Sequence, residues 1–123
     1  MDAKSFVEGL AMNMRDGTVR TTKSWLQEPL KQPDKKQLQA IEFYSTLSPD
    51  QKTQVDQIIS YTSNMSYYLL LCILDHKSTV ENSTNKGKLE LYYEKNGQRT
   101  LLNDLKKVEL TIEAMHVLYD NKP

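Results

Sequence analysis

The chain has 123 residues, the size of a single ordinary domain, and can bury a core without a disulfide or a structural metal. Sixteen basic and sixteen acidic residues cancel, which argues against a general binder of nucleic acid or anionic membranes. Cys72 is the only cysteine, which excludes an intrachain disulfide and fits a reducing compartment. The N-terminus lacks the pattern of a signal peptide, and the longest apolar run is too short to span a bilayer. We therefore expect a soluble cytoplasmic protein, residues 1–123 forming one domain, with no cofactor and no metal.

The first part of the chain is predicted to form two helices. Apolar residues recur at helical spacing over residues 2–15, and Asp2 stands where a cap is expected. Asp16-Gly17 is expected to break this helix, and the same spacing resumes over 18–26.

A connector over residues 28–33 carries a proline near each end. The next helix is predicted over 34–47, because Asp34 and Gln37 form the signature of a capping box. The short link after it should make this helix a close, antiparallel neighbour of the one that follows.

The central element is a helix predicted over residues 49–76. Ser48 and Gln51 form a second capping box, and Pro49 has a backbone φ suited to the first helical turn. Over 65–74 the apolar residues are no longer confined to one face, so we expect this half of the helix to be buried around its whole circumference.

The rest of the chain predicts a loop, a β-hairpin and a last helix. Residues 77–87 are polar, residues 88–102 alternate around an Asn96-Gly97 type I′ turn, and a helix capped by Asn103 or Asp104 should run to residue 119 before a frayed tail. The fold class is therefore α+β and mainly helical, with four or five helices around the central one and one hairpin. The expected hairpin register pairs Glu94 with Arg99, Tyr93 with Thr100, Tyr92 with Leu101 and Leu91 with Leu102.

Catalytic and metal-binding signals are sparse. Cys72 and His76 are four residues apart and should share a helical face, where they could act as a nucleophile with its base or as half of a metal site. The alternative is a packed thiol beside a histidine favoured at the helix C-terminus by the macrodipole. His116 is the only other histidine, so a metal would lack ligands.

The tyrosines suggest recognition more than catalysis. There are seven of them, against two phenylalanines and one tryptophan, and tyrosine is enriched at protein interfaces. Strand alternation places Tyr92 on the outward face of the hairpin with Glu90, Glu94 and Arg99, which we predict to be a partner-binding surface. The alternative is that Tyr92 packs under another helix.

Three segments in order resemble a known pattern: Leu70 to Asp75, then Lys88 to Tyr93 after a polar loop, then Leu101 to Asp104 after an Asn-Gly turn. The pattern resembles that of small uncharacterised bacterial α+β proteins, in which a helix ends in Ile-Leu-Asp and a hairpin closes the domain. Relatives of this kind often carry Gly after the Asp, where this chain has His76. The resemblance implies a fold and no catalytic residue.

These features predict a non-enzymatic protein that binds another protein. The most concrete version is an immunity-type inhibitor, which blocks a bacterial toxin by covering its active site with the hairpin. Two alternatives stay open. One is a small hydrolase or transferase using Cys72 and His76. The other is a structural homodimer, whose interface would be formed by Tyr67, Leu70, Leu71 and Leu74.

Overall fold

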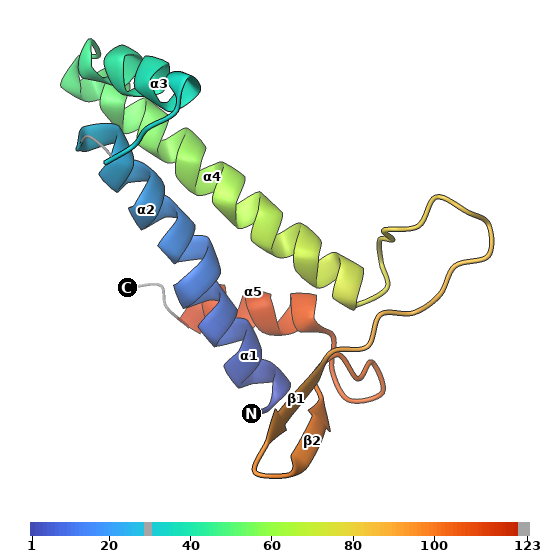
Figure 1. Cartoon of the computed structure of the whole chain (residues 1–123). Coiled ribbons are helices and arrows are strands. Elements are labelled where there is room, and N and C mark those ends of the chain that lie inside the picture. The colour runs from blue at the N-terminus through green and yellow to red at the C-terminus, as the bar shows by residue number, and fades with distance from the viewer. Residues whose placement is uncertain (29–30, 121–123) are drawn as a thin grey trace.

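The computed structural model describes residues 1–28 and 31–120 and confirms a mainly helical α+β fold with one hairpin (Figure 1). Residues 29–30 and 121–123, which belong to the predicted connector and tail, lie outside these ranges. The elements in chain order are α1 (Ala3–Leu10), η1 (Ala11–Arg15), α2 (Asp16–Gln27), α3 (Lys35–Ser45), α4 (Pro49–Leu74), β1 (Tyr92–Lys95), β2 (Gln98–Leu101) and α5 (Leu110–Asp120).

The N-terminal helices form one continuous rod, so the predicted break at Asp16-Gly17 is wrong. The chain passes from α1 to α2 through η1, a π-helical segment, without leaving helical geometry. Where the π segment passes into α2, the carbonyl of Arg15 accepts a hydrogen bond from Ser63 Oγ of α4 at 2.6 Å. A contact with α4 therefore supports the helix where local sequence predicts its end.

The starts of the other early helices are as predicted. The Asp2 side chain caps α1 by accepting from the backbone of Ser5 at 2.8 Å. Complete capping boxes begin α3, at Asp34, and α4, at Ser48. Each of these caps joins residues that are three apart in the chain.

The helix α4 lies alongside the N-terminal rod, and α5 closes the core at the lower end of both (Figure 1). The inward face of α4 carries Tyr67, Leu71 and Leu74, which are 2%, 0% and 8% exposed. These side chains pack with residues of α1, η1 and α5 in a single core cluster, which comprises Val7, Ala11, Tyr67, Leu71, Leu74, Leu110, Ala114 and Val117.

The expectation that residues 65–74 are buried all round is wrong. Met65, Tyr68 and Leu69 are 45%, 40% and 51% exposed. The helices of the core all pack on one side of α4, and the chain after α4 leaves as a loop that extends away from the helices (Figure 1). The outward face of α4 is therefore apolar but uncovered.

This arrangement also overturns the residues predicted for a homodimer interface. Tyr67, Leu71 and Leu74 belong to the chain's own core, and Leu70 is partly buried against it. They are not available to a second copy.

The hairpin has the predicted turn and register, although its strands are shorter than 88–102. Antiparallel pairing joins Tyr92 to Leu101, Tyr93 to Thr100, Glu94 to Arg99 and Lys95 to Gln98. Asn96 and Gly97 have φ of +54° and +76°, the positive values that a type I′ turn requires. Inward packing is partial, since Leu91 contacts the core whereas Leu89 is 45% exposed.

The last helix begins at Leu110, so the predicted cap at Asn103 or Asp104 is wrong. Asn103 is 4% exposed and serves as a cross-link between segments instead. Its amide donates to the carbonyls of Leu74 (2.8 Å) and Leu89 (2.7 Å) and accepts from the backbone of Leu91 (2.9 Å). These bonds tie the base of the hairpin to the end of α4.

Candidate functional site

The four predicted site residues lie on exposed parts of the hairpin, and the structure brings three of them into direct contact. The hydroxyl of Tyr92 donates a hydrogen bond to Glu90 Oε2 at 2.8 Å. On the other side, the guanidinium carbon of Arg99 lies 4.1 Å from the centre of the Tyr92 ring. Because Arg99 is opposite Glu94, it is a diagonal neighbour of Tyr92 across the two strands, a relation within reach of long side chains.

Glu94 is the fourth member of the surface, and its position comes from strand register. It lies opposite Arg99 in the antiparallel pair and is exposed. We call the set Glu90, Tyr92, Glu94 and Arg99 the hairpin surface.

The electrostatics of the hairpin surface follow from these contacts. The hydrogen bond to Glu90 raises the pKa of Tyr92 above its ordinary value, with the Glu90 charge acting in the same direction and Arg99 opposing it. The phenol therefore stays a neutral donor at physiological pH. A cation stacked on its ring adds a weak attraction at an exposed site.

The chemistry available to the hairpin surface is recognition. The ring of Tyr92 is held between a carboxylate and a guanidinium while 40% of the residue is exposed. Tyrosine and arginine are the residue types that most often dominate binding energy at protein interfaces. A side chain that is already ordered loses less conformational entropy when a partner docks on it.

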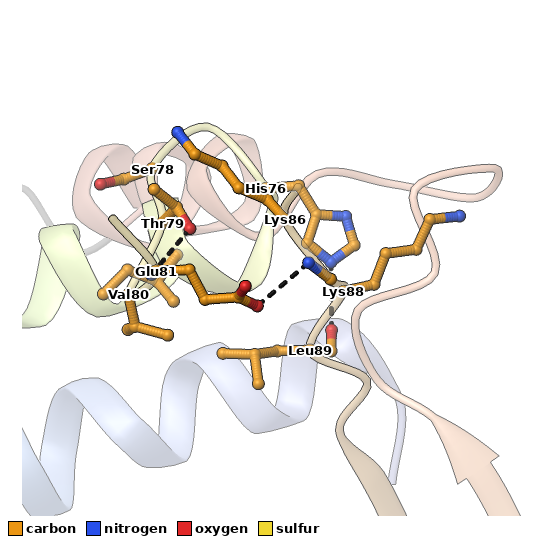
Figure 2. Close-up of a pocket in the computed structure, with 10 residues that line it drawn as sticks. His76, Ser78, Thr79, Val80, Glu81, Lys86, Lys88 and Leu89 are labelled. Atoms are coloured by element: carbon orange, nitrogen blue, oxygen red, sulfur yellow. Dashed lines mark hydrogen bonds between the residues drawn. The ribbon is translucent and has the colours of Figure 1, made fainter. Parts of the chain in front are cut away.

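Apart from the hairpin surface, the structure has a concave site between the end of α4 and the following loop (Figure 2). It is a cavity of about 250 Å³, slightly below the usual range for small-molecule sites. Three of its polar side chains, those of His76, Thr79 and Glu81, hold the loop. Glu81 Oε1 accepts from the backbone of Gly87 at 3.0 Å, the Glu81 backbone donates to Thr79 at 3.0 Å, and His76 Nε2 is 3.1 Å from the carbonyl oxygen of Leu89. These contacts organise the loop, whereas the side chains of Ser78, Lys86 and Lys88 in the lining make no hydrogen bond to the described residues.

Cys72 and His76 do not share a helical face, contrary to the sequence prediction. The helix α4 ends at Leu74, and His76 has a φ of +59°. The backbone of His76 donates to the carbonyl of Ile73 (3.1 Å) and that of Lys77 donates to the carbonyl of Cys72 (2.9 Å). These two bonds define a Schellman motif with His76 in the position usually held by glycine. Cys72 is half-buried and His116 is exposed.

Metal-ligating side chains do not gather in the described ranges, where no three His, Cys, Asp or Glu residues come together in a way that could hold an ion. Within the same ranges, no helix combines the length and apolar character needed to cross a membrane.

Sequence reasoning missed a second exposed surface, the outward face of α4. A signal for it was present, because no charged residue occurs from Gln57 to Leu74. The sequence prediction instead assigned the apolar circumference of residues 65–74 to burial within the chain. Comparison of the chain with family models, with curated proteins and with solved structures gives no match.

Proposed function

We propose that this chain is a non-enzymatic cytoplasmic protein that works by binding another protein through the hairpin surface. The observation that carries the proposal is the ordered, exposed Tyr92, fixed by Glu90 on one side and Arg99 on the other. Contacts of this kind among exposed residues contribute little to the stability of the fold. A side chain that they hold in place, however, loses less conformational entropy on binding, which favours association.

The shape of the ribbon supports a more specific version, in which the protein is an immunity-type inhibitor of a bacterial toxin. A two-stranded hairpin is narrow and extends from the helices at its base (Figure 1). Such a projection can enter a concave active site, while the charged residues beside Tyr92 select a partner of complementary charge. Inhibition would then be steric and would require no chemistry from this chain.

The test uses the purified, tagged chain as bait in an extract of the cell that produces it. Tyr92→Ala and Arg99→Ala remove the aromatic anchor and the cation. Arg20→Ala is the matched control, because Arg20 is also an exposed arginine but lies on α2. We expect one protein to bind the wild type and the Arg20→Ala control, with at least ~10-fold weaker binding to the hairpin variants, equivalent to about 1.4 kcal/mol.

Two results would contradict the proposal: no protein retained above background by the wild type, or equal retention by all variants. The inhibitor version has its own test. The captured protein, expressed alone, should arrest growth, and co-expression of the wild type but not of Tyr92→Ala should relieve the arrest. A captured protein without toxicity would exclude the inhibitor version and leave the binding function intact.

A further inference from the structure

The outward face of α4 carries an apolar stripe that no other element covers. Its members recur at alternating steps of three and four residues, the spacing of a helical seam that packs against another helix. Ile58 and Tyr61 are 64% and 70% exposed, which places them among the most exposed large apolar residues in the described part of the chain. We call this set the α4 stripe, and it consists of Ile58, Tyr61, Met65, Tyr68, Leu69 and Cys72.

The α4 stripe has no charge within it or beside it on the helix. Residues 57–74 contain no Asp, Glu, Lys or Arg, although charged residues make up 26% of the chain. An exposed helix face normally carries charges that keep it in water. A face of this composition is typical of a surface that is covered in the working protein.

The total surface of the chain supports the same conclusion. Its accessible area is 9241 Å², whereas a compact monomer of 14.3 kDa is expected to expose only ~6,800 Å². The chain therefore exposes about 2,400 Å² more than expected. Part of this excess comes from the loop over residues 76–90, where every residue is exposed. A standard interface buries about 800 Å² from each partner, so an interface of that size would remove about a third of the excess.

We infer that the α4 stripe is a homodimer interface, in which α4 of one chain packs against α4 of a second copy. A charge-free apolar stripe offers nothing for a charged partner to complement, but it meets its own copy without like-charge repulsion. Two-fold symmetry then places the same residues on both sides of the contact. The spacing of Ile58, Tyr61, Met65, Tyr68 and Cys72 covers two heptads, long enough for knobs-into-holes packing between the two helices.

This interface is separate from the hairpin surface. The stripe residues all lie on α4, whereas Tyr92 and Arg99 lie on the two strands. A dimer formed through α4 would therefore carry two hairpin surfaces. The inference does not depend on the proposed function.

The test is the mass of the purified chain in solution, measured by sedimentation equilibrium over a dilution series. Met65→Lys places a charge in the middle of the stripe. Met115→Lys is the matched control, because Met115 is 49% exposed on α5 where Met65 is 45% exposed on α4. We expect the wild type and the control to sediment at twice the mass of the 14.3 kDa chain. The Met65→Lys dimer should dissociate at concentrations at least ~10-fold higher than those at which the wild-type dimer dissociates.

A second variant, Tyr68→Lys, tests whether a charge elsewhere in the stripe has the same effect as one at residue 65. Far-ultraviolet circular dichroism checks that each variant is folded. The inference is overturned if the wild type has the mass of one chain throughout the series. It is also overturned if both stripe variants dimerise as tightly as the Met115→Lys control. Because the measurement uses the purified chain alone, a missing protein partner for the hairpin surface would leave its result unchanged.

Discussion

Replacement of Asp75 should strongly destabilise the chain. Asp75 is the residue after α4, and it is only 4% exposed. Its carboxylate accepts three hydrogen bonds from the start of α5: from the backbone of Leu110 at 2.8 Å, from the backbone of Thr111 at 2.9 Å and from Thr111 Oγ1 at 2.8 Å. It therefore acts as the N-terminal cap of α5 from a position 35 residues earlier in the chain.

The surroundings of Asp75 leave no substitute for this carboxylate. Leu110 and Thr111 are 0% and 1% exposed, so water cannot readily reach their backbone N–H groups. Lys77 Nζ contacts Thr111 Oγ1 at 2.8 Å and Glu109 at 2.9 Å, closing the outer side of the cluster. The hydrogen bond to Glu109 raises the pKa of Lys77, which keeps this outer cation charged.

The magnitude follows from these contacts. Loss of an ordinary helix cap costs about 0.5–2 kcal/mol, and burial raises the cost because each orphaned group keeps a desolvation penalty of about 1–3 kcal/mol. With two buried backbone donors left unpaired, Asp75→Ala should lower the free energy of unfolding by about 3 kcal/mol. Asp75→Asn should cost less, because the amide oxygen can still accept from one of the donors.

The assay is urea unfolding followed by circular dichroism, with Asp104→Ala as the control. Local sequence marks Asp104 as a cap of the last helix, but its side chain accepts only from the backbone of Lys106, at 3.1 Å. We expect Asp104→Ala to cost less than about 1 kcal/mol, with an unchanged dependence of stability on urea. If Asp75→Ala cost no more than Asp104→Ala, the assignment of the α5 cap would be refuted.

Three further predictions use the same unfolding assay. Burial raises the pKa of Tyr67, so stability should be complete below pH 10.0, the ordinary tyrosine value, and fall as the pH rises towards the folded-state pKa. Tyr67→Phe should reduce this fall, to which Tyr92 and Lys77 also contribute, while costing about 1 kcal/mol at neutral pH, where the hydroxyl donates to the carbonyl of Val7; an unchanged alkaline fall would contradict it. At His76, whose φ is +59°, glycine should be more stable than alanine by about 1 kcal/mol; equal stabilities would refute backbone strain there. Asn103→Ala removes three hydrogen bonds at a buried position and should cost about 3 kcal/mol. It should also accelerate amide hydrogen exchange at Leu91, and unchanged exchange would contradict the cross-linking role.

The features that could be predicted from sequence depend on interactions between near neighbours. The capping boxes at Asp34 and Ser48 act over three residues. The Asn96-Gly97 turn sets the hairpin register, because its length and backbone geometry determine which residues face each other. The alternation that follows then places Tyr92 and Arg99 among the exposed residues of the ribbon.

The wrong predictions depend on interactions between distant residues. The helical rod continues past Arg15, whose carbonyl accepts a hydrogen bond from Ser63, 48 residues later in the chain. The last helix begins at Leu110 because Asp75 caps it there, while Asn103 is drawn into bonds with the end of α4. Local signals at Asp16-Gly17 and Asn103 are real preferences, but a tertiary partner of greater strength overrides each of them.

The error on α4 has a different origin, because periodicity reports that a face needs cover without saying which molecule provides it. An apolar circumference over residues 65–74 is compatible with burial inside one chain or with burial between chains. The chain itself covers only the face of Tyr67, Leu71 and Leu74. The prediction of burial therefore holds for the outward face, which carries Met65 and Tyr68, only if a second molecule covers it, as the homodimer that we infer would do.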